Sequence, residues 1–270
     1  MKIKSYLHFL LASFLLLACA TPLCAKDYLI ICSGQSNMAG IAPVDTMPEP
    51  LKAIPANIVF YKNSDVTKPL EPLASFADGP KYGPTPSFAH ALADAFPNDR
   101  FIILLNAVGG SGLMEWVPDY GPEELTHRVN KSGADIKMKV GNLYSFVPNQ
   151  VDTIRQKYPD ATPLAFVWIQ GESDVTPWAA AYLPNFKRLV ANMRKVTATP
   201  DLFVITADPG KAEQPVYDAF VQSAKDDKNS THVPTRDLNP GNGLHYSPTA
   251  YVEIGKRLAA AVIAHLNTNP

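Results

Sequence analysis

Short, mostly apolar runs alternate along the chain with stretches in which apolar residues recur at helical spacing. Continuously apolar runs predict strands that are buried on both faces, as in a parallel sheet covered by helices. These runs are Tyr28–Cys32, Ile58–Tyr61, Phe101–Leu105, Leu164–Ile169 and Leu202–Thr206. The predicted helices are Ser87–Phe96, Phe146–Lys157, Ala179–Lys195, Pro215–Lys225 and Thr249–Leu266. The alternation predicts a three-layer α/β/α domain with a mostly parallel sheet.

Two long segments interrupt this alternation. Ala42–Pro84 is rich in proline and contains one predicted strand, and Glu115–Asn142 has mixed charge and weak periodicity. Long connections in compact domains often carry function, so we expect both segments to overhang the site.

The start of the chain has the pattern of an export signal. Lys2 and Lys4 precede an apolar stretch that ends at Leu17 and is short for a membrane span, and small residues follow it. We predict a signal peptide over residues 1–25, followed by a single exported domain over residues 26–270, periplasmic or secreted. A lipoprotein anchored at Cys19 is the second interpretation, because the residues before Cys19 loosely match a lipoprotein signal.

Charge and cysteine content narrow the function classes. Cleavage after Ala25 removes Lys2 and Lys4 and no acidic residue, which changes the net charge from −1 to −3. This balance does not suit nucleic acid or an anionic membrane as a partner. Cys32 is the one cysteine that cleavage leaves, so the domain must be stabilised by its core rather than by an internal disulfide. The mature sequence has no histidine or cysteine spacing typical of a metal site, and no metal or cofactor is expected.

A serine lies in a tight turn directly after the first predicted strand. Ser36 follows Gly34 and Gln35 at the carboxyl end of that strand, where the chemistry of open α/β sheets collects. A serine in a strand-to-turn position can present its hydroxyl as a nucleophile. An ordinary turn or helix cap is the alternative, since both favour serine and asparagine.

Two further polar segments follow predicted strands. Gly109 and Gly110 can bring backbone N–H groups close to an oxyanion, although a plain flexible turn has the same composition. Gln170 can offer a side-chain N–H to the same oxyanion, and Glu172 can orient an imidazole. A polar turn that caps the next helix is the alternative for this second segment.

His245 lies on a loop just before the last predicted helix. Ser247 is a good N-cap and Pro248 suits the first helical position, so a rigid helix entry follows the histidine. This placement suits a general base for Ser36, while a structural or merely exposed histidine is the alternative. The candidate substrate contacts are Gln35, Asn37 and Trp116.

Together these segments resemble the SGNH-type carbohydrate esterases, and among them the sialate O-acetylesterases and acetylxylan esterases of carbohydrate esterase family 6. The matching segments are Gly34-Gln35-Ser36-Asn37-Met38, Gly109-Gly110-Ser111, Trp168-Ile169-Gln170-Gly171-Glu172-Ser173-Asp174 and Gly243-Leu244-His245. The resemblance implies a flavodoxin-like SGNH hydrolase fold and hydrolysis of acetyl esters on carbohydrates without a cofactor. It implies Ser36 as nucleophile, His245 as base, and an oxyanion hole formed by Ser36, by Gly109 or Gly110, and by Gln170.

One position departs from the family pattern. Many relatives carry aspartate three residues before the catalytic histidine, where this chain has Asn242. An amide cannot stabilise an imidazolium by charge as a carboxylate does. Some members use the glutamate of the Gln-Gly-Glu segment instead, so Glu172 is the predicted third member of the triad and Asn242 a supporting hydrogen-bond partner. Asp174 and Asp237 are weaker choices for that third position.

Two other functions fit parts of this pattern. The first is a lipase-like or thioesterase-like SGNH enzyme that acts on another acyl group. The second is a carbohydrate-binding protein whose catalysis has decayed at Asn242. The joint presence of Ser36, Gln170, Glu172 and His245 argues against the second. An acetylated carbohydrate is the predicted partner.

Overall fold

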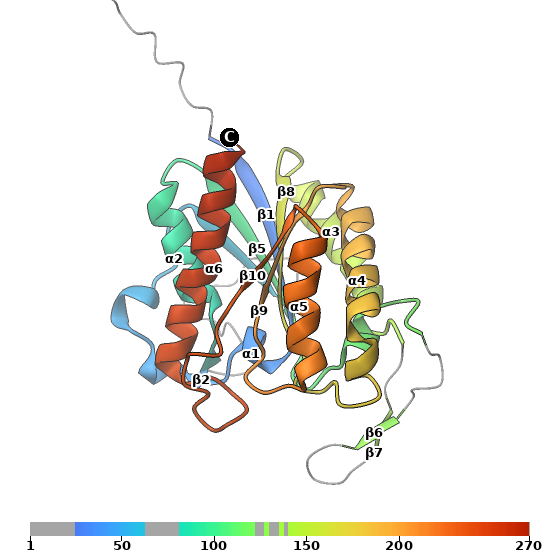
Figure 1. Ribbon diagram of the computed structural model, residues 1–270. Coiled ribbons are helices and arrows are strands. Elements are labelled where there is room, and N and C mark those ends of the chain that lie inside the picture. The colour runs from blue at the N-terminus through green and yellow to red at the C-terminus, as the bar shows by residue number, and fades with distance from the viewer. Residues whose placement is uncertain (1–24, 63–80, 122–126, 130–134, 138–139, 270) are drawn as a thin grey trace, which may run out of the picture.

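A parallel sheet of six strands lies at the centre of the computed structural model, which describes residues 25–62, 81–121, 127–129, 135–137 and 140–269 (Figure 1). The strands are β1 Asp27–Gly34, β3 Ile58–Lys62, β5 Arg100–Ala107, β8 Thr162–Ile169, β9 Phe203–Ala207 and β10 Ser230–Val233. Their order across the sheet is β10-β9-β8-β1-β5-β3. The chain therefore builds one side of the sheet first and then crosses to the other side of β1, and ligands of such sheets bind where the order reverses.

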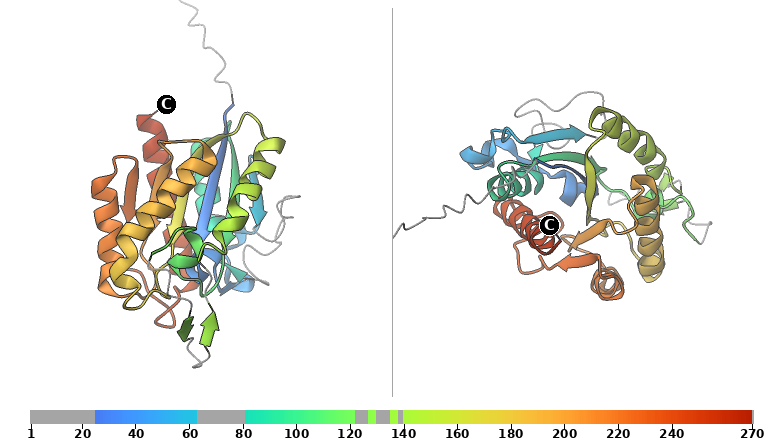
Figure 2. Two further views of the ribbon diagram at one scale, coloured as in Figure 1. Left: turned by 90° about the vertical axis from the view of Figure 1, so that its right-hand side faces the viewer. Right: turned by 90° about the horizontal axis from the view of Figure 1, so that it is seen from above.

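Helices cover both faces of the sheet (Figure 2). On one face lie α2 Thr85–Ala95 and α6 Pro248–Thr268, and on the other lie α3 Val147–Lys157, α4 Tyr182–Thr197 and α5 Gln214–Asp226. Successive residues of β1 point to opposite faces, so Ile30 packs in the core under α2 and α6 while Ile31 packs in the core under α3 and α4. The predicted three-layer α/β/α fold with a parallel sheet is confirmed.

The five predicted strands and five predicted helices are all present, with ends that differ by a few residues. The predicted helix Ala179–Lys195 begins as a 3₁₀ turn, η5 Ala179–Ala181, and continues as α4 to Thr197. The pattern missed β10 because Ser230–Val233 is polar and only Val233 of this edge strand is buried. It also missed short pieces: α1 Ser36–Ala39, β2 Ala42–Pro43, η1 Val44–Thr46, η2 Glu49–Leu51, β4 Lys81–Tyr82, η3 Leu113–Trp116, β6 His127–Val129, β7 Asp135–Lys137 and η4 Tyr144–Phe146.

Several sequence predictions concern residues outside those that the structure describes. Residues 1–24, and with them nearly all of the predicted signal peptide and Cys19, fall outside, as do parts of the two long segments predicted to overhang the site. Among the helices that are described, none combines the length and the apolar content needed to cross a bilayer.

Three neighbouring strands end level with one another at the carboxyl edge of the sheet. Gly34 of β1 lies opposite Ala107 of β5 and Ile169 of β8. The backbone of Gly34 has φ +142°, and a Cβ atom on this residue would lie 2.0 Å from the carbonyl oxygen of Ile169. Only glycine fits this close approach. The turns that follow the three strands are thereby brought together at one place.

Candidate active site

The nucleophile and base predicted from the sequence lie in contact. Ser36 is the first residue of α1, directly beyond the end of β1, and its Oγ lies 2.9 Å from Nε2 of His245. His245 reaches this position from the loop before α6, where Ser247 caps the helix by accepting the backbone N–H of Ala250 at 3.2 Å. A serine hydroxyl at hydrogen-bond distance from an imidazole nitrogen is the geometry that proton transfer to a general base requires.

The glycine turn after β5 lies beside Ser36. A Cβ atom on Gly109 would come to 4.0 Å from the Cβ of Ser36, and Gly109 is exposed. Within the described residues, the backbone N–H groups of Ser36, Gly109 and Gly110 have no acceptor. Three free donors next to a nucleophile can stabilise negative charge that develops on an attacked carbonyl oxygen.

Gln170 differs from the expectation that its side chain donates to the oxyanion. It is fully buried, and its Nε2 lies 3.1 Å from Gln35 Oε1, 3.0 Å from the carbonyl oxygen of Ser111 and beside Asp174 Oδ2. Its Oε1 accepts the hydroxyl of Tyr182 at 2.7 Å. These interior acceptors engage both amide hydrogens. The amide therefore supports the glycine turn through the carbonyl oxygen of Ser111, and it does not point towards Ser36 Oγ.

Glu172 also has partners other than those expected. Its Oε1 accepts hydrogen bonds from Asn37 Nδ2 and, at 2.9 Å, from the backbone N–H of Gly210, while its buried Oε2 has no hydrogen-bond partner among the residues that the structure describes. No hydrogen bond joins this carboxylate to His245 within the described residues. Burial of the carboxylate raises the pKa of Glu172 to about 7, and the bonds from Asn37 and Gly210 only partly oppose that rise.

Asn242 is the residue found beside the second ring nitrogen of His245. Asn242 Nδ2 lies 3.3 Å from His245 Nδ1, and Asn242 Oδ1 accepts the backbone N–H groups of Leu244 at 3.1 Å and His245 at 2.8 Å. The two backbone donors determine which way the amide faces. Its NH₂ group is therefore turned towards the imidazole.

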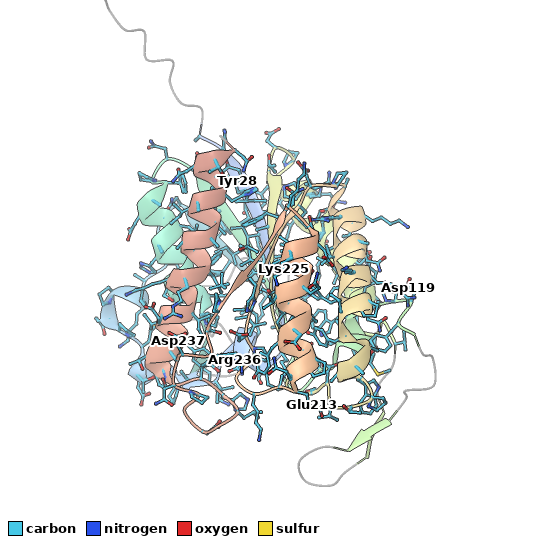
Figure 3. All side chains as sticks on the ribbon, in the orientation of Figure 1. Tyr28, Asp119, Glu213, Lys225, Arg236 and Asp237 are labelled. Carbon is cyan, nitrogen blue, oxygen red and sulfur yellow. The ribbon has the colours of Figure 1, made fainter. Side chains whose placement is uncertain are left out.

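The two weaker choices for a triad carboxylate lie elsewhere. Asp174 is buried and accepts the backbone N–H of Leu113 at 3.1 Å. Asp237, labelled near the foot of α6 in Figure 3, forms a two-pronged ion pair with Arg257 at 2.7 and 2.8 Å. Neither carboxylate is hydrogen-bonded to the imidazole within the described part of the chain.

The candidate substrate contacts Gln35, Asn37 and Trp116 are all interior. Their relative exposures are 2%, 0% and 1%. The Nε1 of Trp116 donates to Ser111 Oγ at 3.0 Å, and its ring packs edge-on against Trp168. These side chains support the turns that carry the site and have little surface to offer a sugar.

The sequence pattern also missed how the segment after β8 supports its neighbours. Ser173 Oγ donates to the carbonyl oxygen of Gly110 at 3.0 Å, next to the contacts that Gln170 and Asp174 make with the same turn. Four polar residues within five positions at the end of a buried strand were the signal, because buried polar groups at such a place need partners.

Within the described residues, no group of three histidine, cysteine or acidic side chains is arranged to hold a metal ion.

Comparison with family models matches residues 26–264 to the family described as carbohydrate esterase, sialic acid-specific acetylesterase. The chain belongs to this family. The resemblance predicted from the sequence is confirmed, and the protein is a carbohydrate esterase that acts on O-acetyl groups. Comparison with curated proteins gave no match.

Solved structures share the fold of this carbohydrate esterase. A protein from Arabidopsis thaliana superimposes with a TM-score of 0.70 at 23% identity, over 88% of this chain and 98% of its own. The structure of NanS gives a TM-score of 0.63 at 17% identity, over 90% and 98%. A carbohydrate acetylesterase from Xanthomonas citri gives 0.58 at 16% identity, over 88% of this chain and 56% of its own.

Proposed function

We propose that Ser36 and His245 hydrolyse O-acetyl esters of glycans through an acetyl-enzyme intermediate. The observation that carries this proposal is the 2.9 Å contact between Ser36 Oγ and His245 Nε2 beside the free N–H groups of the glycine turn. It supplies a nucleophile, a base and oxyanion donors at one edge of the sheet, as acyl transfer requires.

In the first half-reaction Ser36 Oγ attacks the acetyl carbonyl carbon while His245 Nε2 takes the hydroxyl proton. The carbonyl oxygen becomes an oxyanion that accepts from the N–H groups of Ser36 and of Gly109 or Gly110. The tetrahedral intermediate then collapses, the bond to the sugar oxygen breaks, and His245 returns its proton to that oxygen. The deacetylated glycan leaves, and the acetyl group stays on Ser36.

In the second half-reaction His245 removes a proton from water, and the water oxygen attacks the acetyl-enzyme. The same backbone donors stabilise the second oxyanion. Collapse breaks the bond to Ser36 Oγ, which recovers its proton from His245, and acetate leaves. Backbone donors do not need to reorganise during the reaction, and loss of one typically costs on the order of a hundredfold or more in rate.

The substrate class and setting belong to the same proposal. The family description supports O-acetylated sialic acid as the first substrate to test, with acetylated xylan as the second.

The signal-like start supports export of residues 26–270 as one domain, because its basic residues, apolar run and small residues match a leader. The mass of the exported protein tests the site of cleavage. A mass that corresponds to cleavage near Ala25 would support an exported form without a lipid, whereas a mass that includes a lipid on Cys19 would support the anchored form.

Acetate release tests the chemistry. Wild-type protein should release acetate from an O-acetylated glycan, and Ser36→Ala and His245→Ala should each lower kcat by about a thousandfold or more. The control is Ser33→Ala, because the buried Ser33 hydroxyl in β1 has no hydrogen-bond partner in the described part of the chain and should be dispensable. Faster turnover of long-chain than of acetyl p-nitrophenyl esters would favour a lipase, and glycan binding equal in wild type and Ser36→Ala without hydrolysis would favour a binding protein.

A further inference from the structure

Asn37, the residue after the nucleophile, is hydrogen-bonded to both neighbours of the base. Its Nδ2 donates to the carbonyl oxygen of Leu244 at 3.0 Å, and its Oδ1 accepts the backbone N–H of Tyr246 at 3.1 Å. Tyr251 of α6 adds a hydroxyl to Oδ1 at 2.8 Å. His245 lies between Leu244 and Tyr246, so one buried amide joins the turn of the nucleophile to the loop of the base.

Glu172 is the fourth partner of that amide. Glu172 Oε1 can accept this bond whether the carboxyl group is ionised or neutral, so it keeps the NH₂ group of Asn37 turned towards Glu172 and Leu244. Glu172 also accepts the backbone N–H of Gly210, and a Cβ atom on Gly210 would lie 2.1 Å from the carbonyl oxygen of Leu244. The loop after β9 thus packs directly on the loop of the base, and the same carboxylate secures it.

We propose that Glu172 is a positioning residue that acts through Asn37, and that this Asn37–Glu172 pair sets the distance between Ser36 Oγ and His245 Nε2. The inference rests on the proposed function of Ser36 and His245. It assigns Glu172 no contact with substrate and no direct bond to the imidazole. Asn37 is buried and Glu172 is partly buried next to the dyad, so their loss should lower kcat and leave KM for small esters nearly unchanged.

The expected size follows from the geometry of proton transfer. A displacement of about 1 Å between reacting groups can cost on the order of a hundredfold in rate. Glu172→Ala removes the acceptor and should lower kcat by about that factor. Glu172→Gln keeps an oxygen that can accept from both Asn37 and Gly210, and should stay within about tenfold of wild type.

The two variants of Glu172 separate positioning from direct participation. If the carboxylate served the imidazole by its charge, Glu172→Gln would lose activity as severely as Glu172→Ala. The pair must also behave as one unit. Asn37→Ala, which also loses the bonds to Leu244, Tyr246 and Tyr251, should be at least as slow as Glu172→Ala. The double variant should be slower than Asn37→Ala by much less than Glu172→Ala is slower than wild type, because the contact within the pair is lost only once.

Reaction of Ser36 with a fluorophosphonate provides the readout, since this reagent requires the nucleophile and base but no sugar. Labelling rates should fall in the order wild type, Glu172→Gln, Glu172→Ala and then Asn37→Ala. The control is Asn185→Ala on α4, which removes another buried amide bonded to Gly121 and Ala181. That variant should lower Tm and leave the labelling rate of folded protein unchanged.

Each result counts for or against the pair. Folded Glu172→Ala that labels as fast as wild type overturns the inference, even if acetate release from glycans is confirmed. If the wild-type protein labels rapidly but releases no acetate from any glycan, the proposed substrate is wrong, and the positioning role of the Asn37–Glu172 pair is unaffected. If Glu172→Ala does not fold, Asn37→Asp takes its place: it keeps the size of the side chain, removes both Nδ2 donations, and must slow labelling by a similar factor.

Discussion

At the scale of single residues, the side chain beside the His245 imidazole has the wrong polarity for a neighbour of the proposed base. Asn242 turns its NH₂ group towards His245 Nδ1, while its oxygen accepts two backbone N–H groups. An N–H that donates to Nδ1 favours the tautomer with its proton on Nε2. A base for Ser36 needs a lone pair on Nε2, so this amide opposes the reactive tautomer.

Asn242→Asp should therefore increase activity. The carboxylate keeps one oxygen for the backbone donors and places the other at Nδ1, where it accepts a proton and stabilises the imidazolium. We expect kcat on p-nitrophenyl acetate to rise about tenfold or more, with the acid limb of the pH–rate profile moved to higher pH. Asn242→Ala is the control, because it removes the amide without adding charge. Equal kcat in wild type and Asn242→Asp would show that another group orients the ring.

The meeting of the candidate residues at one edge of the sheet could be predicted from the sequence, but the direction of their side chains could not. Ser36, His245 and the glycine turn follow strand ends or precede a helix, and the structure brings them together. Gln170 lies at the same edge, yet its amide points inward to Gln35, Ser111 and Asp174. A sequence indicates which turn a residue occupies. The direction in which its side chain points depends on hydrogen-bond partners that lie far away along the chain.

At the scale of elements, the site depends on the close approach of β1 and β8. Gly34→Ala would place a methyl group 2.0 Å from the Ile169 carbonyl oxygen, at a backbone φ of +142° that alanine rarely adopts. Either the strands separate or the turn before Ser36 changes shape. We expect a loss of about 3 kcal/mol or more in the free energy of unfolding, measured by urea denaturation.

Gly109→Ala is the matched comparison for that prediction. Among the described residues other than its chain neighbours, the atom nearest to the new Cβ would be the Ser36 Cβ at 4.0 Å. The free energy of unfolding should therefore change by less than about 1 kcal/mol. The two substitutions add the same methyl group to turns at the same edge of the sheet. Equal stability of the two variants would contradict the account of the β1–β8 approach.

Element prediction from the sequence succeeded for the apolar strands, including the edge strand β3, and failed for the polar edge strand β10. The central strands are continuously apolar because helices cover both sides. β10 is an edge strand whose Ser230, Thr231 and His232 are only partly buried, so it lacks the apolar signal. The order of the strands is set by how connections cross the sheet, which no local pattern encodes.

At the scale of the whole molecule, one buried carboxyl group should make stability depend on pH. The pKa of Glu172 rises from its ordinary value of 4.5 to about 7 because burial disfavours the charged form. Between these two values the folded protein binds a proton that the unfolded chain has released. The contribution of this group to stability is therefore fully present below pH 4.5 and is lost as the pH rises to about 7 and beyond.

Glu172→Gln removes this dependence because glutamine does not titrate. A rise of this size corresponds to about 3 kcal/mol, so wild type should lose about that much stability relative to Glu172→Gln between pH 4.5 and 8. Urea denaturation of both proteins at several pH values measures the difference, and the other titrating groups cancel in it. A constant difference across that range would show that Glu172 is ionised in the folded protein at pH 5. The Asn37–Glu172 pair would then be a charge-assisted contact at every pH at which the enzyme works.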